Sequence, residues 1–139
     1  LIFIQSNCYN HTMKHVVIGI LYKNHHLCVA KRLSEPFKGY IECPGGKVEL
    51  DETLVDALKR ELFEEINLQN FEYQYLREIL VLNEHGSFTL HFYKITTNEE
   101  CTPKVYTELL WVHRDQIETL NWIPHNLPYI DFFKQVDQL

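Results

Sequence analysis

Residues 45–68 read GGKVELDETLVDALKRELFEEINL, and this stretch decides how the chain folds. It predicts a loop followed by a helix that carries Glu61, Glu64 and Glu65 in its last turns. Positions i, i+3 and i+4 lie on one helical face, so the three carboxylates are expected to converge on one patch. Such like charges repel each other, and a divalent cation with a preference for hard oxygen ligands would relieve the repulsion. The stretch therefore predicts a site for Mg²⁺, with Mn²⁺ as an alternative.

The competing interpretation is an ordinary solvated acidic face, which is what Glu64 and Glu65 alone would indicate. The wider spacing favours the metal site. From Gly46 onward the chain resembles the Nudix box, GX5EX7REUXEEXGU with U a bulky aliphatic residue, and it departs from that pattern only at Asn67, where the family has Gly. Asn is the non-Gly residue that best tolerates a left-handed helix end, so we expect this departure to be structurally mild.

Local signals define the helix within this stretch. Asp51 or Thr53 can cap its first turn, and Thr53 with Asp56 three residues later resembles a capping box. The helix is expected to bury one apolar stripe, made of Leu54, Val55, Leu58, Leu62 and Ile66.

Arg60 precedes the first glutamate of the cluster. It can pair with Glu64 one turn later, or with Glu52 if the loop folds back, and the alternative is an ordinary surface ion pair. Within the family, we expect Arg60 to orient the acidic face.

The resemblance implies further metal contacts outside the helix. A backbone carbonyl at Gly45 is expected to be a ligand, together with a carboxylate from the loop before the last strand. Glu108 is the candidate, with Glu99 or Glu100 as alternatives, although a strand-start surface glutamate would look the same. Glu61 or a loop residue such as Glu108 is expected to take the proton from the attacking water, and the sequence leaves that choice open.

Two cations are candidates for substrate binding. Arg32 ends a predicted strand and corresponds to an Arg that faces the substrate in MutT-like members of the family. Lys47 directly follows the Gly45-Gly46 turn and is placed to meet a phosphate as a point charge. A solvent-facing strand end for Arg32 and a surface position for Lys47 are the alternatives.

The sequence PHNLP at residues 124–128 resembles the Pro-x-Asn-x-Pro stretch with which MutT-like members read an oxidised purine. The amide of Asn126 could accept a hydrogen bond from N7–H of 8-oxoguanine and donate one to O6. The alternative role is an N-cap of the last helix. Four aromatic residues are candidates either for stacking walls or for the core, namely Trp122, Tyr129, Phe37 and Tyr40.

The rest of the chain suits a single α/β domain. Residues 13–139 are expected to form a Nudix α/β/α sandwich with a mixed central β-sheet and the Nudix loop-helix, and residues 1–12 an N-terminal extension without fixed structure. Expected strands lie at 15–21, 27–32, 40–44, 71–82, 87–97 and 108–113. A helical turn at 114–120 and a last helix at 127–136 follow, the latter with Leu127, Ile130, Phe133 and Val136 on its inner face.

Composition limits the partners and the location of the protein. A net charge of −6 argues against a nucleic acid polymer as partner. Cys8, Cys28, Cys43 and Cys101 form no CxxC pair, so free thiols in a reducing compartment are expected. No signal peptide or membrane span is predicted. We therefore expect a cytoplasmic protein, a monomer or weak dimer, that does not enter a membrane.

The resemblance implies a Mg²⁺-dependent hydrolase that converts a nucleoside triphosphate, 8-oxo-dGTP above all, to the monophosphate and pyrophosphate. Sequence markers of NADH pyrophosphatases, dinucleoside polyphosphate hydrolases and ADP-ribose hydrolases are absent after the box, which favours this substrate class. Two alternatives stay open. One is hydrolysis of another triphosphate, such as a pyrimidine nucleotide, and the other is a non-catalytic nucleotide sensor, which would be expected to have a damaged box.

Overall fold

The computed structural model describes residues 13–83, 86–104 and 107–139, and the expected extension at residues 1–12 lies outside this range. The strands are β1 (Met13–Lys23), β2 (His26–Arg32), β3 (Ile41–Glu42), β4 (Gly45–Lys47), β5 (Glu72–Asn83), β6 (Gly86–Thr96) and β7 (Thr107–His113). The helices are α2 (Leu54–Ile66) and α3 (Ile130–Val136), with 3₁₀ helices η1 (Arg114–Thr119) and η2 (Pro124–Tyr129).

The strands form one mixed sheet in the order β3-β2-β1-β6-β5, with β4 paired to β1 and β7 paired to β2. The β1–β6 pair is parallel, whereas the pairs β1–β2, β1–β4, β2–β3, β2–β7 and β5–β6 are antiparallel. Both predicted hairpins, β1–β2 and β5–β6, are therefore confirmed.

The sequence predicted a turn at Gly45-Gly46, and this prediction is wrong. Residues 45–47 form the strand β4, which pairs with residues 16–18 of β1. A Cβ atom on Gly45 would lie 2.1 Å from the carbonyl oxygen of Val17. The glycine thus permits a close approach of two backbones rather than a reversal of the chain.

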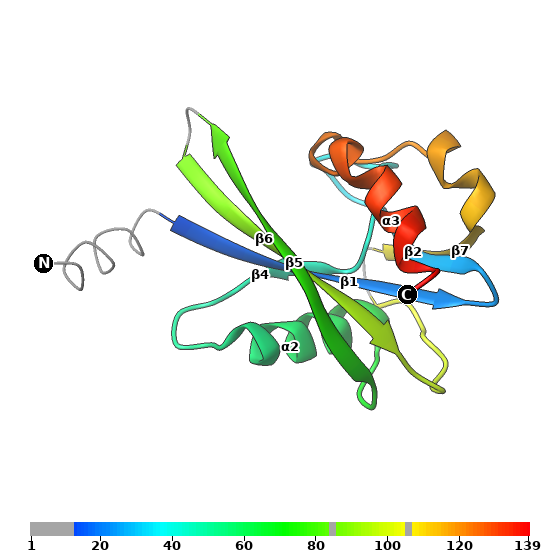
Figure 1. Ribbon diagram of the computed structural model, residues 1–139, viewed down its shortest axis with the longest axis horizontal. Helices are drawn as coiled ribbons and strands as arrows, with labels where there is room; N and C mark the ends of the chain where they lie inside the picture. The colour runs from blue at the N-terminus through cyan, green and yellow to red at the C-terminus, as the bar shows by residue number, and fades with distance from the viewer. Residues whose placement is uncertain (1–12, 84–85, 105–106) are drawn as a thin grey trace, which may run out of the picture.

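The sheet lies between two helical layers (Figure 1), which confirms the α/β/α sandwich. Side chains of β1 alternate between the layers, since Val17 and Leu21 pack towards α2 while Ile18 and Ile20 pack towards α3. Each face of the sheet therefore has its own hydrophobic core, and β1 contributes to both.

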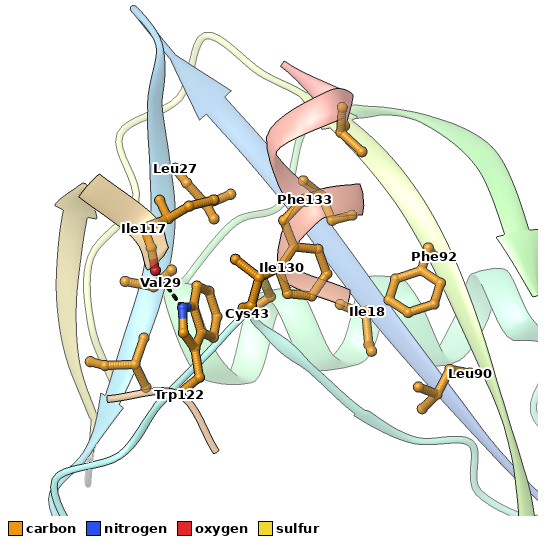
Figure 2. Close-up of a cluster of buried hydrophobic side chains, with 13 residues drawn as sticks. Ile18, Leu27, Val29, Cys43, Leu90, Phe92, Ile117, Trp122, Ile130 and Phe133 are labelled. Carbon is orange, nitrogen blue, oxygen red and sulfur yellow. Dashed lines mark hydrogen bonds between the residues drawn. The ribbon is translucent and has the colours of Figure 1, made fainter. Parts of the chain in front are cut away.

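The core on the α3 side contains Trp122, which is only 3% exposed (Figure 2). Its indole Nε1 donates a 2.6 Å hydrogen bond to the carbonyl of Ile117, and its ring packs against Phe133. Tyr129 packs against Phe92 of the same core. Trp122 and Tyr129 are consequently core residues, so the stacking role considered for them is wrong.

The last helix starts later than predicted. Residues 124–129 form the 3₁₀ helix η2, α3 begins at Ile130, and Leu127 is 57% exposed instead of facing inward. Pro128 explains the difference, because proline lacks a backbone N–H and disfavours the α conformation of the residue before it. Ile130, Phe133 and Val136 are buried as expected.

Both ends of α2 are fixed by short-range contacts. Thr53 is the N-cap and forms the capping box with Asp56, and Asn67 adopts the left-handed conformation at φ 56° and ψ 35°, as predicted. The backbone N–H groups of Thr102 and Lys104 donate to the carbonyls of Ile66 and Glu65. The loop after β6 therefore satisfies the last carbonyls of the helix that carries the glutamates.

The buried face of α2 differs from the predicted stripe at three positions, all in the first turns of the helix. Leu58, Leu62 and Ile66 are buried, whereas Leu54 and Val55 are only half-buried and Ala57 takes a fully buried place. The helix packs on the sheet through these residues, which turns its opposite edge, with the glutamates, towards β4.

Candidate active site

A cavity of about 390 Å³ opens between the sheet and η2. Val16, Ile18 and Leu90 form an apolar floor from β1 and β6, and residues 45–47 of β4 form one edge. Asn126 lines the cavity from η2. An apolar cleft with a few polar groups is the usual form of a small-molecule site.

Glu61 of α2 reaches the β4 edge of this cavity. A Cβ atom on Gly46 would lie 2.4 Å from the Cδ atom of Glu61, so any side chain at Gly46 would collide with the carboxylate. The backbone N–H of Gly45 donates a 3.2 Å hydrogen bond to Oε2 of Glu65. The two glycines of the box thus let β4 lie directly against two carboxylates of α2.

Burial changes the protonation of these two groups. The pKa of Glu65 is raised to about 9, first by burial and then by the nearby charge of Glu61, against a smaller opposing effect of the Gly45 amide. Burial also raises the pKa of Glu61, although Arg60 opposes the shift. Two close carboxylates with too little positive charge around them are the donor set that a divalent cation stabilises. The residues present therefore fit such a cation.

Arg60 links the box loop to the helix. Its Nε donates to Glu52 at 2.6 Å, and its Nη1 donates to Glu61 at 2.8 Å and to Glu64 at 3.3 Å. Its Nη2 also donates to the backbone carbonyl of Lys47 at 3.0 Å. The hydrogen bond from Arg60 lowers the pKa of Glu52 to about 2. Both predicted partners, Glu52 and Glu64, therefore bind Arg60 at the same time.

The expected convergence of all three glutamates is only partly found. Glu61 and Glu65 lie together, whereas the Glu64 side chain is 55% exposed and is held by Arg60. No group of three His, Cys, Asp or Glu side chains within the described ranges is arranged to hold a metal ion. The guanidinium of Arg60 stands between Glu64 and Glu61, because its Nη1 donates to both, whereas Glu65 accepts from the Gly45 amide instead.

The loop carboxylates lie apart from this pair. Glu108 is exposed on β7 opposite Lys31, and Glu100 is also exposed. Glu99 accepts hydrogen bonds from the backbone amides of Gln69 and Asn70, which engages it at the turn after α2. In the part of the chain that the structure describes, none of the three lines the cavity.

All three substrate-binding candidates line the cavity, namely Arg32, Lys47 and Asn126. The Nη1 atom of Arg32 lies 3.4 Å from Glu42, a neighbour on β3 that also lines the cavity. This pair fixes the guanidinium at the cavity wall, so Arg32 is not a free strand end.

Asn126 is 8% exposed, and its side-chain amide makes no hydrogen bond to another described residue. The N-cap interpretation is wrong, because the N-caps of η2 and α3 are Ile123 and Tyr129. A nearly buried amide on a cavity wall, with no hydrogen bond from the side chain to the residues that the structure describes, is available to a ligand.

Sequence reasoning missed several lining residues, including Phe88, His125 and Cys43. Burial raises the pKa of the Cys43 thiol, which keeps it neutral. Phe88 and Leu90 alternate along β6, so the two-residue period of the strand could have placed them on one face. Nothing in the sequence indicated that η2 would cover that face.

A family model described as the NUDIX domain matches residues 13–135. The chain belongs to the Nudix family. Nudix hydrolases generally use divalent metal cations and bind nucleotide substrates, in agreement with the carboxylate pair and the cavity. The predicted fold and family are thereby confirmed.

Two curated relatives carry names of different activities. A Buchnera aphidicola (subsp. Schizaphis graminum) protein named 8-oxo-dGTP diphosphatase is 29% identical over 130 residues, covering 86% of this chain and 96% of that protein. A Methanocaldococcus jannaschii protein named ADP-ribose pyrophosphatase is 44% identical over 52 residues, which cover 37% of this chain and 31% of that protein. Both names describe hydrolases of acid anhydrides, and this Nudix chain is an enzyme of that class.

Among solved structures, a MutT structure from work on the Aliivibrio salmonicida and Vibrio cholerae proteins superposes with a TM-score of 0.75. It is 24% identical and covers 91% of this chain and 99% of that chain. The likeness supports the fold. In addition, no described helix is both long and apolar enough to cross a membrane.

Proposed function

We propose that this Nudix hydrolase is a Mg²⁺-dependent nucleoside triphosphate pyrophosphohydrolase that converts 8-oxo-dGTP to 8-oxo-dGMP and pyrophosphate. The observation that carries the proposal is the amide of Asn126, which has no side-chain hydrogen bond to another described residue and lines the same cavity as Gly45 and Gly46, beside the Glu61–Glu65 pair. One cavity thus has an amide that can form hydrogen bonds with a nucleobase and, at its edge, a pair of carboxylates that can bind a cation.

The carboxylates of Glu61, Glu64 and Glu65 would hold the cation, with the carbonyl of Gly45 and with Glu108 as further candidate ligands. When bound, Mg²⁺ supplies Lewis-acid polarisation of the phosphate oxygens and a lower pKa for water. Mn²⁺ offers the same oxygen-ligand chemistry. Glu64 can join the pair only by exchanging its contact with Arg60 for the cation.

In the reaction, the oxygen of water forms a new bond to phosphorus, and the bond that joins the monophosphate to the departing pyrophosphate breaks. The proton of the water goes to a carboxylate. Glu61 is favoured over Glu108 as this base because Glu61 lies at the cavity edge, whereas Glu108 is exposed on β7. Arg32 and Lys47 would neutralise the charge that the phosphates carry.

Selectivity for the oxidised base follows from the amide of Asn126. Its oxygen accepts from the N7–H that 8-oxoguanine has gained, while its NH₂ donates to O6. Guanine has an acceptor at N7, so its lone pair would face the amide oxygen. A buried amide left without a matching partner costs about 1–3 kcal/mol, which corresponds to about 5- to 150-fold in affinity.

The proposed role is the removal of an oxidised nucleotide from the cytoplasmic pool, which avoids mutation during DNA replication and requires no contact with a nucleic acid polymer. The net charge of −6 is consistent with that role. The activity needs a single copy of the cavity, so a monomer or weak dimer suffices.

The experiment is pyrophosphate release by the purified chain with Mg²⁺ and with excess chelator, at low concentrations of 8-oxo-dGTP, dGTP and dCTP. We expect 8-oxo-dGTP to lead dGTP by about 10²-fold in kcat/KM, because the cavity pairs with the oxidised base. Release should stop with the chelator. A higher kcat/KM for dCTP than for 8-oxo-dGTP would indicate a pyrimidine nucleotide as the substrate. No pyrophosphate release from any triphosphate would favour a non-catalytic nucleotide sensor.

A further inference from the structure

The cavity holds one phenyl ring among its described lining residues, and it is that of Phe88. The aromatic residues that the sequence suggested as stacking walls lie elsewhere. Trp122 and Tyr129 pack in the α3 core, while Phe37 packs edge-on against Tyr40 outside the cavity lining. The described lining residues with aromatic rings are Phe88 on β6 and His125 on η2, and Phe88 supplies the apolar ring of the two.

Phe88 stands on a rigid part of the fold. Its backbone pairs with Lys14 of β1 on one side and with Val81 of β5 on the other, so β6 is held between two strands at this point. The Phe88 side chain packs against the α3 core and remains half-buried. One part of the ring is thus anchored, and the part that lines the cavity is free to meet a ligand.

The neighbours of Phe88 continue the same surface. Val16 and Leu90 are direct partners on β1 and β6, one step further along the strands, and both form the apolar floor. Asn126 stands on the wall that η2 contributes. A base held in this cavity would therefore have both the Phe88 ring and the Asn126 amide among the residues around it.

We propose that Phe88 is a specificity-determining residue that stacks on the nucleobase and favours purines over pyrimidines. This inference rests on the proposed function of the cavity. Stacking is sequence-tolerant because every base has a π-face, and a two-ring purine covers more of a phenyl ring than a one-ring pyrimidine. Asn126 therefore selects the oxidised form, whereas Phe88 selects the class of base.

The test is equilibrium binding of nucleoside monophosphates, which needs no turnover. Isothermal titration of wild type and Phe88→Leu with 8-oxo-dGMP, dGMP and dCMP should show about 10-fold weaker binding of both purine nucleotides and a smaller loss for dCMP, whose single ring covers less of the phenyl ring. Phe88→Tyr keeps the ring and should bind purines as wild type does. In steady-state assays with 8-oxo-dGTP, Phe88→Leu should raise KM and leave kcat unchanged, since stacking acts on ground state and transition state alike.

Phe132→Leu is the matched control, because Phe132 is also a partly buried ring against the α3 core but does not line the cavity. It should lose stability comparably and bind purines normally. Thermal unfolding of each variant separates loss of fold from loss of stacking. Should Phe88→Leu melt below the working temperature, Phe88→Trp replaces it, and the predicted result is retained purine preference.

Folded Phe88→Leu that binds purine monophosphates as tightly as wild type overturns the inference. An equal loss for dCMP and the purines overturns the class selectivity. If wild type binds dGMP as well as 8-oxo-dGMP, the proposed substrate fails, yet a purine-specific loss in Phe88→Leu still supports the role of Phe88. Failure of wild type to bind any monophosphate contradicts both.

Discussion

The two ends of the cavity are built in different ways. At the proposed cation end, Glu61, Glu64 and Glu65 come from two turns of one helix, and Arg60 of the same helix binds Glu61 and Glu64. At the base end, Phe88 and Asn126 lie 38 positions apart in the sequence and meet only because η2 covers β6. In the proposed function, local spacing thus controls the chemistry, whereas long-range packing controls which base is accepted. Changes at the two ends should therefore have separable effects.

Glu61→Gln should give the largest effect. We expect kcat for 8-oxo-dGTP to fall by about 10³-fold, within the usual contribution of a general base, while Kd for 8-oxo-dGMP stays unchanged. The fold should persist, because removing a charge beside buried Glu65 relieves repulsion. Pyrophosphate release, titration with the monophosphate and thermal unfolding measure the three quantities.

Glu108→Gln is the matched control for this prediction. Because Glu108 is exposed on β7, its loss should reduce kcat far less than Glu61→Gln does. A larger loss of kcat in Glu108→Gln than in Glu61→Gln would identify Glu108 as the general base. The catalytic carboxylates would then not all come from one helix.

Stability of the metal-free protein should fall as pH rises. The pKa of Glu65 is about 9 in the folded chain against 4.5 for an ordinary glutamate, so the folded state binds more protons between these values. The contribution of Glu65 to stability is then fully present below about pH 4.5 and is lost progressively up to about pH 9. The free energy of unfolding falls by at most about 1.4 kcal/mol per pH unit from this group. Urea unfolding at pH 6 and pH 8.5, with chelator, measures the slope.

Glu65→Gln should flatten that slope, since the amide cannot lose a proton. Mg²⁺ should stabilise wild type more at pH 8.5 than at pH 6, because the cation competes with the proton for the same carboxylate. If the free energy of unfolding of Glu65→Gln changed with pH as steeply as that of wild type, the pH dependence would not come from the Glu61–Glu65 pair.

Trp122→Phe should cost about 2 kcal/mol in the free energy of unfolding and leave base selectivity intact. The change removes the indole hydrogen bond to the Ile117 carbonyl, which keeps only its longer bond from the Leu120 N–H, and it removes part of a buried ring. Denaturant unfolding together with the kcat/KM ratio of 8-oxo-dGTP to dGTP checks both parts. A changed ratio would indicate that Trp122 contributes to base recognition and would weaken the proposal that Phe88 is the stacking residue.

Asn67→Gly, which restores the family residue, should have the smallest effect. Gly relieves the cost of a left-handed φ of 56°, but it loses the hydrogen bond from the Asn67 amide to Thr102. We expect a change within about 0.5 kcal/mol and an unchanged kcat. A large loss of kcat would mean that the Asn67–Thr102 contact positions the glutamates of α2.

Most of the fold could be predicted because the deciding signals are local. An apolar run followed by a turn predicted β1 and β2, alternation predicted β5 and β6, and the capping box with Asn67 predicted both ends of α2. The errors occurred where backbone constraints prevailed over a pattern. The Gly45–Gly46 pair is a strand because β4 needs a close approach to Val17, and Leu127 faces solvent because Pro128 interrupts the α-helix.

The candidate site, like the fold, could be predicted where local motifs decide it and not where tertiary packing does. Glu61, Glu65, Arg32 and Lys47 reach the cavity or its edge, as local motifs indicated. The position of Glu64 depends on which carboxylates Arg60 engages, and that competition cannot be read from helical spacing. The ring of Phe88 could not be chosen either, since many aromatic residues alternate suitably and only tertiary packing places one in the cavity.

The most direct test of this account is the ratio of kcat/KM for 8-oxo-dGTP to that for dGTP, measured with Mg²⁺ in wild type and in Asn126→Ala. We expect a high ratio in wild type and a ratio reduced at least about 10-fold in the variant, with kcat for 8-oxo-dGTP largely kept. Equal ratios in the two proteins, or a loss of kcat with no change in the ratio, would contradict the separation of base reading from catalysis.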